Sequence, residues 1–137
     1  MYITTDDFDT AIYPEVRRAI SRNSQIFMDD KINIALSIAE SKLSLKYDMA
    51  TELAKTGNQR NHLLLGIIKD IAIYYLYETQ ETVPDHRAKR YDDAIDFLND
   101  FKTGKSVLVG VPVATITTTN NNGTMSFGSE TKRNNRL

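Results

Sequence analysis

The side chains that most often perform chemistry in proteins are scarce in this sequence of 137 residues. There is no cysteine, and the only histidines are His62 and His86. The absence of cysteine excludes disulfides, thiolate zinc sites and cysteine nucleophiles. The histidines lack the close pairing that metal-binding helices use, and each lies at the expected start of a helix. We interpret both as surface polar residues and expect neither a metal nor a cofactor.

An acidic row on one expected helix is the densest set of candidate ligands. Its members are Asp92, Asp93, Asp96 and Asp100. Carboxylates at this spacing could bind a divalent cation, but they more often form a solvated face or meet a basic neighbour. No nucleophile, base and orienting group can be nominated together anywhere in the chain. We therefore expect a protein that is not an enzyme.

Apolar residues at helical spacing predict an all-α protein, a small bundle of about four helices. The expected main helices are one that starts at Pro14, one capped by Asp29 or Asp30, one from about Gln59 to Glu78, and one from Pro84 that ends at Gly104. The helix over residues 59–78 is apolar on most of its circumference. It should be buried centrally or shared with a neighbouring subunit.

Four residues on the last two helices are candidates for contacts between subunits. Tyr74 and Tyr77 face away from the expected core position of Tyr75, and tyrosine is enriched at interface hot spots. Arg87 and Arg90 form a basic turn beside the acidic row. The alternative for the arginines is an ordinary solvated face with pairing between residues four apart.

The composition changes after the last expected helix, which divides the chain into a helical body over residues 1–106 and an extended C-terminal arm over residues 107–137. Residues 1–103 carry 13 basic and 17 acidic side chains, whereas residues 104–137 carry 4 basic and 1 acidic. A basic tail on an acidic body often docks onto a partner. The Asn122-Gly123 turn could pair residues 124–127 with residues 115–119.

The arm is also too apolar for a simple spacer, although its polar composition alone would be compatible with disorder. We expect it to leave the body at Val107 and to become β-strand-like when it docks onto a partner. The docking candidates are its apolar and basic residues: Val109, Val111, Val113, Ile116, Met125, Phe127, Lys132, Arg133 and Arg136.

The sequence favours synthesis in the cytoplasm and no membrane association. Its start, MYITTDD, is polar and acidic where a signal peptide would be basic and then apolar. The longest apolar-rich stretch, residues 63–77, is interrupted by Lys69 and Asp70 and is too short to span a bilayer.

Several runs of this sequence resemble the small neck proteins of Mu-like prophages over about residues 1–108. They are MYITTDDF at the start, the apolar helix of residues 30–47, the Asp-Ile-Ala-x-Tyr-x-Leu-Tyr run of residues 70–77, and the Arg-Tyr-x-x-Ala-x-x-x-Leu run of residues 90–98 before Gly104. One departure is residues 48–55, which replace the usual proline-containing stretch.

The resemblance implies a structural virion protein, a head-to-tail adaptor in the neck of a tailed bacteriophage. Such adaptors (also called connectors) form a homo-oligomeric ring, commonly a dodecamer, beneath the portal protein. The arm would reach the portal, a downstream neck or tail protein would bind the other side, and DNA would only pass through the lumen. The acidic row, Asp92, Asp93, Asp96 and Asp100, would then face that lumen.

A second hypothesis is a small helical DNA-binding or regulatory protein that uses Arg17, Arg18 and Arg22 or the basic arm. It requires DNA affinity that falls steeply with salt concentration. The net charge of −1 argues against a dedicated duplex-DNA binder.

Overall fold

Three long helices build the body of the protein in a computed structural model that describes residues 1–115. They are α2 (Gln25–Leu43), α4 (His62–Glu78) and α5 (Asp85–Thr103), and each contacts the other two. The 3-10 helix η1 (Thr5–Thr10) and α1 (Pro14–Ile20) cover one end, while α3 (Met49–Leu53) and the 3-10 helix η2 (Gly57–Gln59) lie at the other. The prediction of a small all-α bundle is confirmed.

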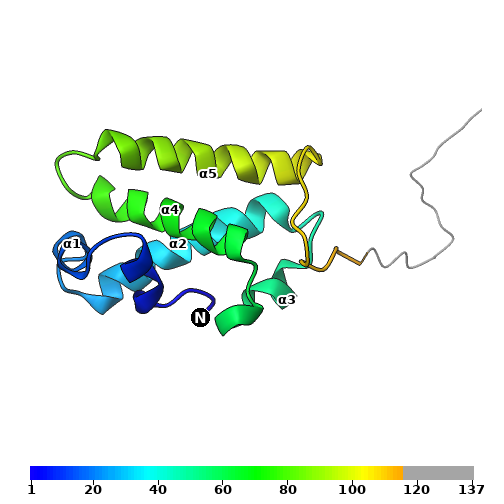
Figure 1. Ribbon diagram of the computed structural model, residues 1–137, viewed down its shortest axis with the longest axis horizontal. Coiled ribbons are helices and arrows are strands. Elements are labelled where there is room, and N and C mark those ends of the chain that lie inside the picture. Colours follow the sequence, from blue (N-terminus) through cyan, green and yellow to red (C-terminus); the bar gives the residue numbers. More distant parts are fainter. Residues whose placement is uncertain (116–137) are drawn as a thin grey trace, which may run out of the picture.

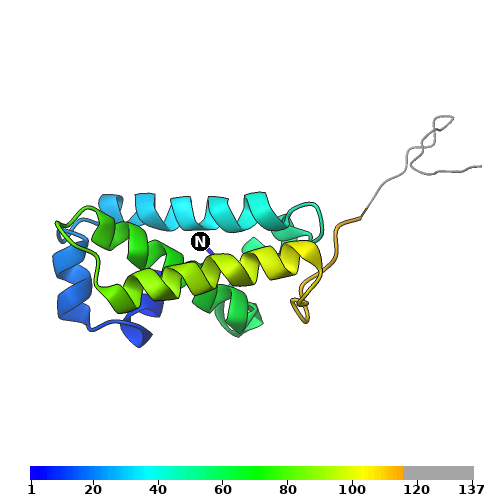
Figure 2. The same cartoon turned by 90° about the horizontal axis from the view of Figure 1, so that it is seen from above.

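Helix α4 lies at the centre because it is apolar on most sides. Its buried residues are Leu64, Leu65, Ile67, Ile68, Ile71, Ala72, Ile73 and Leu76. They pack against both α2 and α5, which run along the length of the body in Figure 2. The helix begins at His62 rather than at Gln59, because Asn61 caps it and Gly57, with a φ of 60°, starts a separate turn.

Helix α2 begins five or six residues earlier than expected, at Gln25 rather than directly after Asp29 or Asp30. The Oγ of Ser24 accepts a hydrogen bond from the backbone N–H of Phe27 at 3.2 Å, so Ser24 is the N-cap. The expected cap at Asp29 or Asp30 is therefore wrong. Asp29 instead accepts a hydrogen bond from Gln25, and Asp30 pairs with Lys31.

Helix α5 ends at Gly104 as predicted, with that glycine in the left-handed conformation at a φ of 86°. The chain then returns to the body near α3 (the yellow to orange segment of Figure 1). Leu108 and Val111 are buried in the core cluster. The expectation that the chain leaves the body at Val107 is wrong.

A single antiparallel β-bridge between Tyr47 and Val113 holds the returning segment. The N–H of Asp48 donates to the carbonyl of Pro112 at 2.8 Å, and the N–H of Ala114 donates to the carbonyl of Lys46 at 3.0 Å. The buried N–H of Leu108 also donates to the hydroxyl of Tyr47 at 3.1 Å. We call residues 107–114 the arm base, because they lie on the body.

None of the helices within residues 1–115 is both long enough and apolar enough to cross a bilayer.

Two glycines allow a matched test of this description. Gly104→Ala should lower the free energy of unfolding by about 1 kcal/mol, because a Cβ is disfavoured at a left-handed φ. Gly66→Ala, inside α4 with open space around its Cβ position, should raise it by about 0.5–1 kcal/mol. Urea unfolding at equilibrium measures both. Effects of the same sign would contradict the assignment of Gly104 as the helix terminus.

Candidate functional site

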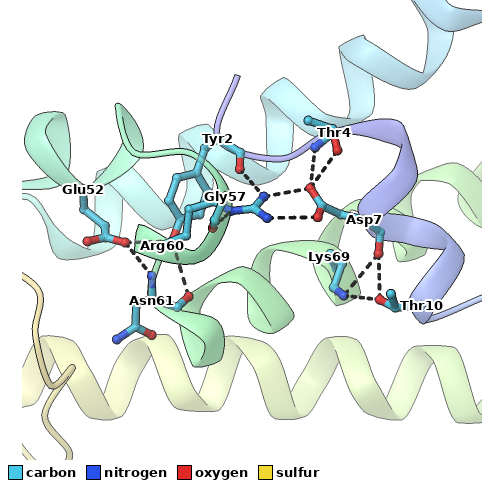
Figure 3. A network of polar contacts seen from close by, with 9 residues as sticks. All are labelled: Tyr2, Thr4, Asp7, Thr10, Glu52, Gly57, Arg60, Asn61 and Lys69. Atoms are coloured by element: carbon cyan, nitrogen blue, oxygen red, sulfur yellow. Dashed lines mark hydrogen bonds and ion pairs between the residues drawn. The ribbon is translucent and has the colours of Figure 1, made fainter.

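A polar network ties the N-terminal segment to the residues that precede α4 (Figure 3). Arg60 donates to both carboxylate oxygens of Asp7, at 2.8 and 3.1 Å, and to the carbonyl of Tyr2 at 2.8 Å. The backbone N–H of Thr4 donates to the same carboxylate at 2.7 Å. Burial would raise the pKa of Asp7, but the hydrogen bonds from Arg60 and Thr4 outweigh it and lower that pKa to about 2.

The carboxylate of Glu52 is completely buried beside this network. It accepts hydrogen bonds from the Tyr2 hydroxyl and from the Asn61 N–H, both at 2.9 Å, and Lys55 Nζ lies 2.8 Å from its other oxygen. Burial would raise the pKa of Glu52, yet these donors hold it below the ordinary value. Burial and the bond to Glu52 raise the pKa of Tyr2. One carboxylate oxygen thus accepts both hydrogen bonds, and the other is paired with Lys55 as an ion pair.

Asn61 extends the network to the arm base. Its Oδ1 accepts from the N–H of Leu64 at 2.9 Å, which caps α4, and its Nδ2 donates to the carbonyl of Val109 at 2.8 Å. The Asn61 side chain therefore joins the start of α4 to the arm base, and its backbone N–H joins both to the buried carboxylate that binds Tyr2.

The predicted docking residues of the arm separate into three groups. Val109 and Val113 are 81% and 71% exposed, whereas Val111 is buried and cannot contact a partner in this conformation. Six further docking candidates lie outside the described residues: Ile116, Met125, Phe127, Lys132, Arg133 and Arg136. All of the expected hairpin except Thr115 also lies outside them. Their roles stay predictions.

Leu45 is an exposed apolar residue that the sequence analysis missed. It is 93% exposed and lies two residues before Tyr47, the bridge partner of Val113. The sequence did contain a signal for this exposure. Leu45 is apolar but lies outside the helical stripe that ends at Leu43 and Tyr47. Leu45 is thus an exposed apolar residue in the segment that pairs with the arm base, in addition to Val109 and Val113.

Two of the four predicted inter-subunit residues contact other side chains within the chain. The ring of Tyr74 stacks on Tyr91 with 4.1 Å between centroids, and burial and the bond to Tyr75 raise the pKa of Tyr91 to about 12. Arg90 Nε pairs with Asp70 at 3.1 Å. Contacts of Tyr74 and Arg90 with another subunit remain a prediction.

The other two, Tyr77 and Arg87, line one groove of about 510 Å³ between η1, α1 and the start of α5. Its walls also include Ala11, Val16 and Tyr13, whose side chain is 76% exposed. Arg87 Nη2 donates to the carbonyl of Ala11 at 3.0 Å.

The acidic row faces mainly solvent. Asp92, Asp93 and Asp96 are exposed and Asp100 is half-buried. Asp93 pairs with Lys89 at 3.1 Å, one helical turn earlier. Within residues 1–115, no three acidic or histidine side chains gather closely enough to hold a metal ion. The lumen-facing role of this row stays a prediction.

These features define a small helical protein with a buried polar network, an exposed acidic row and an arm base held on the body. A family model described as "Bacteriophage Mu, Gp36" matches residues 2–127. The chain belongs to this family and is a protein of Mu-like phages, of the structural or assembly type. Neither the curated proteins nor the solved structures contain a match to it.

The Asp7–Arg60 pair predicts how stability depends on pH. The folded-state pKa of Asp7, about 2, lies below its ordinary value of 3.8. The pair therefore stabilises the fold fully above about pH 4, and this contribution is lost as the pH falls towards 2. Asp7→Asn should cost about 2 kcal/mol at neutral pH and flatten the stability profile below pH 4.

Asp6→Asn is the control, because it removes an exposed carboxylate next to Asp7 with the same change in charge. Urea unfolding at several pH values between 7 and about 2 measures both variants. Indistinguishable profiles for the two would show that Asp7 carries no special acid sensitivity.

Proposed function

We propose that this protein is a head-to-tail adaptor, which forms a ring under the portal in the virion neck and links the portal to the tail. The observation that carries the proposal is the family match over residues 2–127, because it spans the helical body and the arm as far as Phe127. The family model therefore matches most of the arm as well as the body. A ring of about twelve copies is the stoichiometry we propose.

Attachment to the portal is assigned to the arm, starting at its base. Val113 and Tyr47 form a non-hydrogen-bonded antiparallel pair. The backbone N–H and carbonyl of Val113 therefore point away from Tyr47. That open edge can accept a further strand, and the exposed Val109 and Val113 side chains supply apolar contact beside it. The net positive charge of residues 104–137 favours an acidic partner surface.

The acidic row suits the inner wall of the proposed ring. Three of its four aspartates are exposed along α5, and exposed carboxylates repel the DNA backbone. A lumen lined in this way would let DNA pass without binding it.

The DNA-binding hypothesis gains no support from the described residues. Arg17 Nε lies 2.7 Å from Asp9, and the guanidinium of Arg22 lies 4.7 Å from the centroid of the Phe27 ring. Two of the three arginines expected to bind phosphates are thus engaged within the chain.

Portal binding by the arm can be tested in the full-length chain. Val113→Asp should weaken binding to the portal protein by at least about tenfold, because burial of a valine contributes ~1.5 kcal/mol or more. Ile26→Asp is the matched control, since Ile26 is 84% exposed in the first turn of α2, whereas the arm base pairs with Tyr47 beyond the other end of that helix. Biosensor measurements with purified portal give both affinities.

A chain that ends at Thr115 complements this test, because it keeps the arm base and removes the rest of the arm. It should fold, as circular dichroism would show, but lose portal binding. If both the truncated chain and Val113→Asp bound the portal protein with unchanged affinity, the proposal that the arm docks onto the portal would be wrong.

A further inference from the structure

We propose that the outer face of α2 in one copy of this chain packs into the hollow between α4 and α5 of a neighbouring copy. The proposal rests on the ring of the proposed function and assigns its lateral interface. The hollow has a volume of about 330 Å³, and its lining residues come from α4 and α5. The outer face of α2 is the surface formed by Asp30, Asn33, Ile34, Ser37, Ile38 and Ser41.

The outer face of α2 carries less charge than an ordinary solvated helix face. Residues 32–39, INIALSIA, contain no charged side chain, although 26% of the whole chain is charged. Ile34 is half-buried, yet it lies outside the core cluster of the described residues and outside the side chains packed against that cluster. A surface helix normally places charged residues opposite the core. The pattern therefore favours a helix face that another protein covers.

The hollow between α4 and α5 combines an apolar recess with a partly free cation. Leu63 and Phe97, which line it, are 47% and 42% exposed. Gly66 leaves it open, because nothing lies within 4 Å of where a Cβ would be. The side chain of Arg90 is 58% exposed and pairs with Asp70 through Nε. The suitable occupant therefore combines an apolar side chain with a carboxylate.

Asp30 supplies that carboxylate on the outer face of α2. Its side chain is 61% exposed, and the ion pair with Lys31 involves Oδ2 at 3.0 Å. The Nη atoms of Arg90 donate to none of the described residues, because its hydrogen bond to Asp70 uses Nε. A guanidinium has enough donors to bind two carboxylates. Arg90 of one copy can thus keep Asp70 and also bind Asp30 of the next.

The features of the hollow have a fixed spacing along its length. The Arg90–Asp70 pair joins α5 to α4, which are antiparallel (Figure 1). Phe97 follows the arginine by seven residues on α5, and Leu63 precedes the aspartate by seven residues on α4. At about 1.5 Å per residue, both lie about 10 Å along the hollow from the ion pair. Gly66, four residues before the aspartate, lies about 6 Å from it.

The outer face of α2 repeats this spacing. Ile34 and Ser37 follow Asp30 by four and seven residues, so they lie about 6 and 10 Å from it along the helix. With Asp30 placed on the arginine of the ion pair, Ile34 comes opposite the open space at Gly66. Phe97 then lies over Ser37, whose small side chain leaves room for the ring. Each surface thus fills a space in the other, which is how helices pack.

The direction of the helices agrees with a ring. Helices α2 and α5 both start at the left and run to the right in Figure 2, so this match requires two copies in nearly the same orientation. Neighbours in a ring of about twelve copies are rotated only slightly relative to one another. Contact between two different surfaces is heterologous and produces a ring when its rotation closes.

The interface leaves the acidic row free for its proposed place on the inner wall. Asp93 is the one member of the row that lines the hollow, and it pairs with Lys89 at 3.1 Å. Asp92 and Asp96 are exposed and lie outside the hollow. One helix, α5, can therefore contribute to the lateral contact and to the lumen through different sides.

Cross-linking tests the interface directly, because the chain has no natural cysteine. Full-length Ser37→Cys and Phe97→Cys chains are mixed, with and without portal protein, and oxidised. Disulfides between the two chains are expected well above background, because a disulfide forms only where two cysteines come close together. The background comes from mixing Tyr13→Cys with Phe97→Cys, since Tyr13 is 76% exposed but belongs to neither surface. Mass spectrometry identifies the linked peptides.

A charge inside the interface provides the second measurement. Ile34→Asp should weaken subunit association at least about tenfold, because the isoleucine loses its burial against the neighbour. The variant should fold, as circular dichroism would show, because Ile34 lies outside the core cluster. Tyr13→Asp is the control, since it adds the same charge at an exposed residue outside the interface. Sedimentation velocity, alone and with portal protein, measures association.

The outcomes separate this interface from the adaptor function. If rings form but the cross-link between Ser37→Cys and Phe97→Cys stays at background, or if Ile34→Asp associates as well as Tyr13→Asp, the proposed interface is wrong and the adaptor function is unaffected. The same holds if Ser37→Cys links to itself as strongly as to Phe97→Cys, because copies would then meet through one shared face. A chain that remains monomeric both alone and with portal protein overturns the ring as well as its interface.

Discussion

The buried carboxylate of Glu52 fixes the geometry on which the rest of the described structure depends. Removal of a charge from water costs several kcal/mol, so a completely buried carboxylate persists only where donors surround it. Tyr2, Lys55 and Asn61 provide those donors. They come from the N-terminal segment, the end of α3 and the start of α4, so these three parts must be in place together.

Asn61 transmits this constraint to the arm. Its backbone satisfies Glu52, while its side chain caps α4 and binds the carbonyl of Val109. The arm base is consequently held by the same network that holds the N-terminus. A strand that starts from a fixed base loses less conformational entropy when a partner binds it than a strand that starts from a free chain. The boundary between body and arm therefore lies after the arm base, beyond the last predicted helix.

The sequence predicted the helices well because periodicity and caps are local. Gly104 ended α5 as expected, and the helix that is apolar on most of its circumference proved central. The start of α2 was misplaced because Ser24, Asp29 and Asp30 can all cap a helix. The choice among them depends on the extended backbone of Ser24, with a φ of −118°, which the sequence does not specify.

The arm base was misjudged for a different reason. Val107, Val109, Val111 and Val113 alternate as if on one face of a strand, but Gly110 has a φ of 83° and reverses the alternation. Val111 therefore joins Leu108 in the core while Val109 and Val113 stay exposed. The hydrogen bond from Leu108 to Tyr47 spans 61 residues, and no local pattern could reveal it.

Charge explains why assembly of such a protein should depend on a template. Residues 1–103 have four more acidic than basic side chains, so copies brought side by side repel one another. The central helix offers little apolar surface for such a contact, because most of its apolar residues are covered within the chain and Leu63 alone among its large aliphatic residues is 47% exposed. Tyr74 is likewise engaged by Tyr91. Attraction between copies must then come from small apolar and oppositely charged patches, whose combined strength is modest. Basic arms that dock first onto a shared partner would raise the local concentration of bodies and so overcome the repulsion.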